Sequence, residues 1–346
     1  MPPDVLFRPR KDSVVLKITF INVGYGDAIL LESGEGDFRI FIDGGSGEDG
    51  EFSSPLDGRI RSSAYLERLG ITELDLLVIS HFHEDHVCGI EPFVMNGGRV
   101  RELWTPWLVP RELRGVCPCP DLLSVSSKKF LSALNSYNRI VERLSRDGCL
   151  FKELRSPLYD YPLPGGIKAD VLAPSPDIAS FFSGALESLY RAEGEDFASR
   201  LDSLDRKMND FSIVLRFVCG NLGILLPGDA CPSSEAMGMW DKSRLGAHIL
   251  KLAHHGQEDS ISDDFIRAVA PQIVVTCASS DRRYNSANPL VYEKITRIAA
   301  EQGLAPEFIF TGGVPSTPPT PQEPHPHPRP RPALTLVLDG TIKYSL

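Results

Sequence analysis

The sequence has no long apolar segment and no apolar leader at its start. Its 346 residues contain no run of about eighteen apolar side chains, which is the length that a membrane-spanning helix requires. The first twelve residues include Pro, Arg, Lys and Asp and lack the apolar stretch of a signal peptide. These absences predict a protein that does not enter the membrane and that works in the cytoplasm.

Cysteine is sparse, and positive charge is in deficit. The seven cysteines form an odd set, and Cys117 and Cys119 are too closely spaced for a usual zinc knuckle. Reduced, buried thiols are therefore expected.

Lys and Arg number 36 against 46 Asp and Glu, a formal net charge of -10. This balance argues against binding nucleic acid over a broad surface, but it permits a local basic groove or metal ions that meet a phosphate directly.

What the sequence does contain is a dense group of metal-ligand side chains after an apolar run. Residues 74–79 are apolar apart from one Asp, as in a buried strand, and His81, His83, Asp85 and His86 follow within a few positions. Imidazole and carboxylate ligands suit zinc, manganese or iron(II). A solvated, His-rich turn is the alternative, but a strand that delivers three imidazoles and a carboxylate to its own end favours a metal site.

Two later apolar runs end in the same way. The run at 224–229 stops on Asp229, and the run at 249–256 ends in the pair His254 and His255. A single Asp at a strand end is usually a turn or a cap. Three strand ends that all carry ligand types are explained most simply by one shared metal centre.

These residue groups, in their order along the chain, resemble the motifs of the metallo-β-lactamase superfamily. Within it, the sequence is similar to the soluble hydrolase domain attached to ComEC/Rec2 competence proteins and to its stand-alone relatives. The resemblance is carried by residues 20–28, 42–45, 81–86, 212–215, 228–229 and 254–256. It covers the chain from about residue 14 to its end and implies an α+β fold, a four-layer αβ/βα sandwich of two mostly antiparallel sheets with helices outside.

The expected organisation is one hydrolase domain over 13–346, preceded by a flexible arm at 1–12. A Pro-rich insertion at about 314–333 interrupts a terminal hairpin at 333–346. Apolar patterning predicts strands at 14–20, 27–32, 38–43, 74–79, 100–104, 167–172, 249–255 and 272–277, with a hairpin over 209–229. It predicts helices at 59–69, 124–147, 260–269 and 290–302, and a broken helix over 178–208.

The resemblance implies two divalent metal ions, zinc first, with manganese or iron as alternatives. The implied ligands of the first ion are His81 and His83, helped by Asn209. Those of the second ion are Asp85, His86 and one of His254 or His255. Asp229 would bridge the two ions, and Asp43 would support the site by hydrogen bonding. Asn209 stands about where most relatives carry a third histidine. An amide oxygen is a poorer ligand, so the first site is expected to be partly occupied. Alternation along a strand would place His254 and His255 on opposite faces of the sheet, so only one would be a ligand, but it does not say which one.

The loop at 279–289 resembles a family loop that borders the metals. Its candidates for holding an anionic substrate are Arg282, Arg283, Tyr284 and Asn285, and a solvated arginine pair before a helix is the alternative. Asn288 replaces a histidine that relatives carry there. The loop therefore predicts an anion-binding border on one side of the site.

The resemblance implies an enzyme that uses metal-bound hydroxide, oriented by Asp85 and Asp229 as catalytic residues. Because the ComEC-like domain is associated with degradation of a DNA strand, the first hypothesis is a phosphodiesterase or nuclease acting on nucleic acid or a small phosphodiester. Hydrolysis of a small ester, lactone or phosphocholine ester is the main alternative, and the acidic charge favours it. A metal-stabilised regulatory module without catalysis is the second alternative, favoured by the missing third histidine. No protein partner is indicated.

Overall fold

The computed structural model describes residues 15–34, 36–53, 58–114, 123–232, 240–312 and 331–344. The predicted arm at 1–12, the pair Cys117 and Cys119, and most of the predicted insertion at 314–333 lie outside these ranges. Within them, no helix combines the length and the apolar character needed to cross a membrane.

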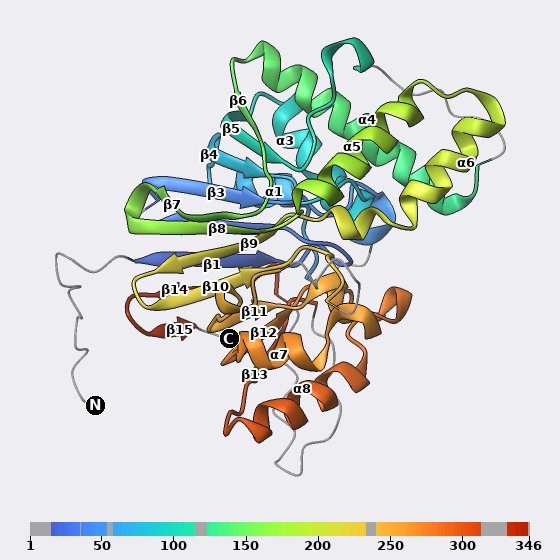
Figure 1. Cartoon of the computed structure of the whole chain (residues 1–346). Coiled ribbons are helices and arrows are strands. Elements are labelled where there is room, and N and C mark those ends of the chain that lie inside the picture. Colours follow the sequence, from blue (N-terminus) through green and yellow to red (C-terminus); the bar gives the residue numbers. More distant parts are fainter. Residues whose placement is uncertain are drawn as a thin grey trace.

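The first sheet has eight strands in the order β15-β14-β1-β2-β3-β4-β5-β6 (Figure 1). Their bounds are Leu16–Ile21 (β1), Ile29–Ser33 (β2), Phe38–Ile42 (β3), Glu73–Val78 (β4), Arg99–Thr105 (β5), Leu150–Glu153 (β6), Ala333–Leu338 (β14) and Ile342–Tyr344 (β15). Neighbours from β15 to β3 pair antiparallel, and neighbours from β3 to β6 pair parallel.

The second sheet has seven strands in the order β13-β12-β11-β10-β9-β8-β7. Their bounds are Leu158–Leu163 (β7), Ile167–Ala173 (β8), Val214–Cys219 (β9), Leu222–Leu226 (β10), Ile249–Lys251 (β11), Ile273–Thr276 (β12) and Glu307–Phe310 (β13). Strands β7 to β10 pair antiparallel and β10 to β13 pair parallel. Both sheets are therefore mixed, and the antiparallel pairing expected for them is found on one side of each.

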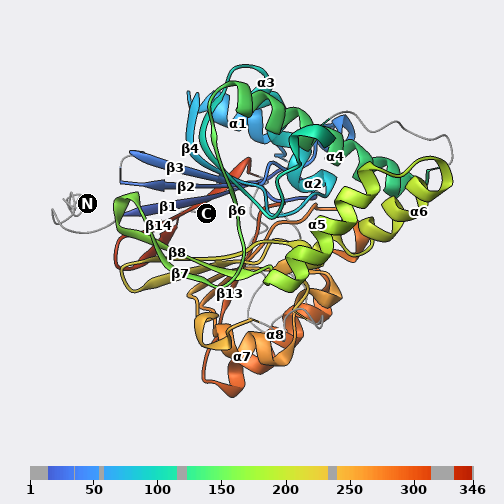
Figure 2. The same ribbon diagram turned by 45° about the horizontal axis from the view of Figure 1, so that its top comes forward.

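Helices cover the outer face of each sheet (Figures 1 and 2). Those on the first sheet are Ser62–Arg68 (α1), Glu84–Val87 (α2), Glu91–Met95 (α3), Val125–Arg146 (α4), Pro176–Tyr190 (α5) and Gly194–Asp205 (α6), and those on the second are Asp263–Val269 (α7) and Pro289–Glu301 (α8). The layers run helix, sheet, sheet, helix, so the predicted four-layer α+β sandwich is confirmed.

Strand β4 shows why the central strands are continuous apolar runs. Leu74 and Leu77 pack in the core beneath the helices, whereas Leu76 and Val78 pack in the core between the two sheets. A parallel strand that is covered on both faces needs apolar side chains at successive positions. The parallel neighbours β3 and β4 end at one edge of their sheet, and β10 and β11 do the same in the other. The segments that follow these four strands form the candidate site.

Candidate metal centre

Asp43 ties together the segments that follow β3 and β4. Its Oδ1 accepts a hydrogen bond from the backbone N–H of Ser80 at 2.7 Å, and its Oδ2 lies 2.7 Å from Ser80 Oγ and 2.9 Å from His86 Nδ1. The segments approach so closely that a Cβ atom on Gly89 would lie 2.1 Å from the Gly44 carbonyl oxygen. Through this contact with His86, Asp43 is in a position to orient the imidazole.

The histidine pair after β11 does not continue the strand. β11 ends at Lys251, and His254 and His255 lie in a short 3₁₀ turn, Ala253–Gly256, with left-handed φ angles of 44° and 53°. Strand alternation therefore does not decide which imidazole reaches the site. Left-handed backbone at residues other than glycine costs free energy and is concentrated at functional sites. Here the turn directs the two side chains to different neighbours.

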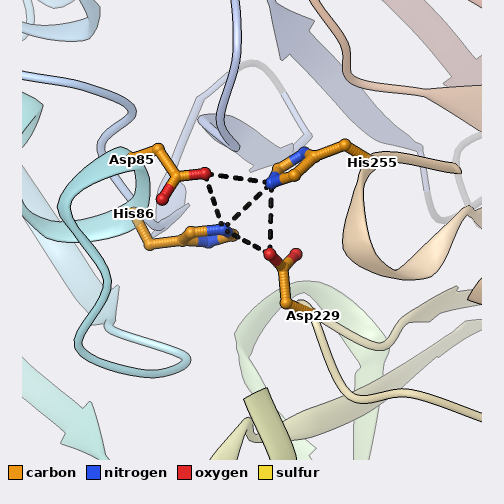
Figure 3. A group of neighbouring side chains, drawn as sticks. All are labelled: Asp85, His86, Asp229 and His255. Atoms are coloured by element: carbon orange, nitrogen blue, oxygen red, sulfur yellow. Dashed lines mark hydrogen bonds and ion pairs between the residues drawn. The ribbon is translucent and has the colours of Figure 1, made fainter. Parts of the chain in front are cut away.

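Four ligand-type side chains converge at this edge: Asp85, His86, Asp229 and His255 (Figure 3). Asp229 Oδ2 lies 3.2 Å from Nε2 of His86 and 3.2 Å from Nε2 of His255. The two Nε2 atoms are 3.3 Å apart, and Asp85 Oδ2 lies 3.1 Å from His255 Nε2 and 3.6 Å from His86 Nε2. His255, rather than His254, is the histidine from the pair that joins this group.

The chemistry of these four groups fits a divalent metal ion. The outer Nδ1 atoms of both imidazoles face acceptors, Asp43 Oδ2 for His86 and the Cys277 carbonyl oxygen for His255, each at 2.9 Å. In the neutral imidazoles, the Nε2 atoms therefore present lone pairs toward each other and toward two carboxylates. Four acceptors in one small space repel each other unless a cation lies among them. Ligand atoms about 2.0 Å from a tetrahedral zinc are about 3.3 Å apart, close to the spacing here.

His81 and His83 form a second, smaller pair. His81 Nε2 lies 3.1 Å from His83 Nδ1, and their outer nitrogens contact Ser80 Oγ and the Asp205 carbonyl oxygen, each at 3.1 Å. The inner nitrogens are again arranged as two ligand atoms. Within the described part of the chain, no group of three or more His, Cys, Asp or Glu ligand atoms includes this pair.

Asn209 lines the same cavity as His83 and contacts His254. Its Nδ2 lies 3.2 Å from His254 Nε2, so the structure places the predicted amide ligand beside the other histidine of the 254–255 pair. Asp205, which was not predicted as a site residue, contacts His83 Nε2 through its backbone carbonyl oxygen and, at 3.4 Å, through its Oδ1. The pair His81 and His83 therefore offers two inner ring nitrogens, and the group Asp85, His86, Asp229 and His255 offers four ligand atoms.

The electrostatics of the site balance carboxylates against imidazoles. Burial, together with the neighbouring His86 and His83, holds the pKa of His81 well below its ordinary value. For His255, burial alone would lower the pKa, but the Asp229 and Asp85 carboxylates raise it to about 9. Without a cation, protons on the imidazoles compensate the carboxylates. Protons and a divalent ion therefore compete for the same nitrogen atoms.

A buried lysine, which was not predicted as a site residue, lies behind Asp229. Lys251 Nζ is fully buried, pairs with Asp27 Oδ2, donates to the Gly228 carbonyl oxygen at 3.1 Å and lies 3.5 Å from Asp229 Oδ1. The signal in the sequence was a single lysine within an otherwise apolar strand. Its charge compensates two buried carboxylates that no surface contact could neutralise.

The site opens into a cavity of about 360 Å³. Tyr25, His83, Asp85, Asp229, Arg283 and Tyr284 are among its lining residues. A neighbouring cavity of about 540 Å³, bordered by α4, shares Glu48, Glu84 and Lys129 with it. The two cavities thus form an extended depression along one side of the site.

Two of the four predicted substrate-binding residues line this cavity. Arg283 is there but pairs with Glu51 and, at 3.2 Å, with Asp281, so much of its charge is already compensated. Tyr284 packs edge-on against Tyr25, with 5.0 Å between ring centroids. Arg282 and Asn285 are not among the described residues that line the cavity.

Residues 21–97 match the family model described as Metallo-beta-lactamase superfamily. The matched segment contains Asp43 and the whole of the ligand cluster His81, His83, Asp85 and His86. Together with the four-layer sandwich, this match confirms the resemblance to the metallo-β-lactamase superfamily, a hydrolase fold whose members bind divalent metal ions.

Within that class, the chain is similar to competence proteins. It is 24% identical over 289 residues to ComE operon protein 3 of Bacillus subtilis (strain 168), a match that covers 81% of this chain and 30% of that protein. It is 29% identical over 122 residues to Competence protein ComA of Neisseria gonorrhoeae, covering 33% of this chain and 18% of that protein. The chain thus spans less than a third of the length of either relative.

Similar solved structures include the metallo-beta-lactamase fold protein YhfI from Bacillus subtilis, with a TM-score of 0.44 and 10% identity over 86% of this chain and 97% of that chain. Unliganded yeast PDE1 has a TM-score of 0.43 and 14% identity, also over 86% of this chain and 97% of that chain.

Proposed function

We propose that the chain is a metal-dependent hydrolase of the ComEC-like type and that it cleaves phosphodiester bonds. The observation that carries the proposal is the convergence of Asp85, His86, Asp229 and His255, two of which, Asp85 and Asp229, line an open cavity. These four residues would hold one divalent ion, and His81 and His83 would contribute to a second. Bound divalent ions supply Lewis acidity, which activates water and stabilises negative charge on a phosphoryl or carbonyl oxygen.

The surrounding residues hold the ligand side chains in place. Asp43 and the Cys277 carbonyl oxygen keep the protons of His86 and His255 on Nδ1, so that both Nε2 atoms face the site. Asp205 orients His83 in the same way through its carbonyl oxygen. Because these partners lie directly after strands or at the end of helix α6, the fold itself sets the orientation of the ligand side chains.

Tyr25 is the residue best placed to donate a hydrogen bond to a substrate. Its side chain is 9% exposed, lines the cavity and packs against the His255 ring with 4.4 Å between centroids. Its hydroxyl oxygen accepts from Gln257 Nε2 at 2.9 Å, and among the described residues no acceptor is assigned to its proton. Burial and the carboxylates of Asp85 and Asp229 raise the pKa of Tyr25, which keeps the phenol protonated. The proton is therefore free for an oxygen on the substrate.

Replacing Tyr25 by phenylalanine is expected to lower kcat about 10- to 100-fold while metal content stays unchanged. A hydrogen bond to a charged group contributes about 1.5–3 kcal/mol, and phenylalanine retains the packing against His255. Steady-state kinetics beside metal analysis would measure both effects. Tyr161→Phe is the matched control, because that ring packs against Trp104 with 5.6 Å between centroids and is not among the described residues that line the cavity, so it should change kcat little. Equal kcat in wild type and Tyr25→Phe would contradict the role.

The function is tested with the full chain loaded with zinc or manganese. Wild type and Asp85→Ala are assayed on bis-p-nitrophenyl phosphate, single-stranded DNA, RNA, a p-nitrophenyl ester, a phosphocholine ester and a lactone. We expect phosphodiester cleavage that is lost in Asp85→Ala. Bound metal with turnover only on the ester, phosphocholine ester or lactone would replace the phosphodiesterase with the small-molecule hydrolase. Bound metal without turnover on any substrate would favour the regulatory module.

The small-molecule alternative has one specific observation in its favour. The cavity lining includes Glu48, Glu51 and Glu84 in addition to the candidate ligands, and the chain has a formal net charge of -10. Lys129 in the same lining already pairs with Glu48 at 2.9 Å. An acidic rim disfavours a long polyanion more than it disfavours a short neutral ester. Activity on a dinucleotide that exceeds activity on long single strands would reflect this rim.

A further inference from the structure

A second group of metal-ligand side chains lies beside the centre and takes no part in it. Asp259 Oδ2 lies 3.2 Å from Cys231 Sγ, and His254 Nδ1 lies 2.9 Å and 3.0 Å from the two Asp259 carboxylate oxygens. Cys231 Sγ is 3.9 Å from His254 Nδ1. All three residues are partly exposed, so an ion in solution can reach them.

We propose that Cys231, His254 and Asp259 form a separate binding site for a thiophilic divalent cation such as zinc. At tetrahedral zinc with ordinary bond lengths, ligand atoms of these three types are about 3.4–3.6 Å apart. The distances observed between them are within about 0.5 Å of that spacing. A thiolate, a carboxylate and a neutral imidazole neutralise a divalent cation, and water supplies the fourth ligand.

The same two turns contribute side chains to both sites. The turn after β10 carries Asp229 toward the centre and Cys231 toward the second group, and the turn after β11 carries His255 and His254 in the same respective directions. The His254 and His255 ring centroids are 6.4 Å apart. The left-handed backbone of the histidine pair is what sends neighbouring side chains to two different ligand groups.

Cation binding redistributes two protons. The Cys231 thiol releases its proton to solvent and forms a bond from sulfur to the metal. His254 keeps one proton, which moves from Nδ1 to Nε2, and Nδ1 then donates its lone pair to the metal. Nε2 faces the side-chain amides of Asn209 at 3.2 Å and Gln257 at 2.9 Å, and rotation of these amides presents an oxygen to the new N–H. The net charge of the site thus gains the charge of the divalent cation and loses that of one proton.

This rearrangement reaches Tyr25 through Gln257, a step that rests on the function proposed above. Gln257 Nε2 now lies 2.9 Å from both the Tyr25 hydroxyl and His254 Nε2. Once His254 Nε2 carries the proton, Gln257 turns its oxygen toward both groups, and Tyr25 donates to that oxygen instead of to a substrate. An ion in the second site therefore lowers hydrolysis to about the level of Tyr25→Phe.

Cobalt(II) spectroscopy of the full chain tests the site independently of activity. Metal-free wild type titrated with cobalt(II) is expected to develop a thiolate-to-cobalt charge-transfer band in the near ultraviolet. Cys231→Ala should lack the band and bind one cobalt fewer, whereas Cys149→Ala, a buried free cysteine elsewhere, should retain both. Asp85→Asn, which weakens only the centre, should keep the band. Circular dichroism confirms that each variant is folded.

Three results would overturn the proposal: no band in wild type at cobalt saturation, a band that survives in Cys231→Ala, or a band lost in Asp85→Asn. The inhibitory consequence has its own measurement. Zinc added beyond the amount that saturates Cys231→Ala should inhibit wild type about 10- to 100-fold and leave Cys231→Ala active. A cobalt band without this inhibition would retain the site and reject its link to Tyr25. Absence of activity in every variant would reject the proposed function and leave the spectroscopic result unaffected.

Discussion

Replacing Asp229 by asparagine is expected to weaken divalent metal binding more than about 100-fold and to abolish hydrolysis with it. Asp229 Oδ2 lies 3.2 Å from both His86 Nε2 and His255 Nε2, so it contacts both imidazoles of the centre. Asparagine keeps the shape of the side chain but removes its charge. Metal analysis after dialysis against a weak chelator, beside the phosphodiesterase assay, would measure both losses.

Asp170→Asn is the matched control for this substitution. Asp170 is 1% exposed and pairs with Arg216 at 3.0 Å on β8 and β9, away from the centre. Its replacement should reduce stability but leave metal content and kcat unchanged. If Asp229→Asn retained the wild-type metal content, the centre would not be the group Asp85, His86, Asp229 and His255.

Much of the fold follows from apolar patterning, because the central strands are buried on both faces. The predicted helix at 124–147 is α4, Val125–Arg146, which Ser124 caps by accepting from the backbone N–H of Ser127. The predicted hairpin over 209–229 is β9 and β10. Strand β6, by contrast, was not predicted, because its residues are exposed or half-buried and lack apolar contrast. Edge strands of this kind depend on their neighbours for pairing rather than on their own sequence.

The ligand types of the site could be predicted, but their partners could not. His81, His83, Asp85 and His86 are close in the chain, so a short motif reveals them. Contacts such as Tyr25 with Gln257 join residues 232 positions apart and leave no local pattern. The choice between His254 and His255 depended on a left-handed turn at residues that disfavour it, and a strand had been expected there. Local propensity gives way where tertiary contacts fix a functional site.

Replacing Lys251 by methionine is expected to destabilise the metal-free protein by about 3–5 kcal/mol. Methionine fills a similar volume but leaves the Asp27 and Asp229 carboxylates buried without the cation that lies between them. Denaturant unfolding of the metal-free protein, followed by circular dichroism, would measure the loss. Lys168→Met is the matched control: Lys168 is 57% exposed and lies 3.7 Å from Asp160, so its removal should change stability little.

Because we attribute that loss of stability to electrostatics, we also expect a second result, in metal binding, that can be measured separately. Because the Lys251 charge repels a divalent ion at Asp229, its removal should strengthen metal binding, and added metal should then restore part of the stability of Lys251→Met. The double variant Asp27→Asn with Lys251→Met should be more stable than the sum of the single losses predicts, since it removes both partners of one buried pair. The contrary result would be a loss of stability in Lys251→Met that is the same with and without metal, and the same with and without Asp27. That result would show that the lysine contributes through packing alone. The buried charge would then have no part in organising the centre.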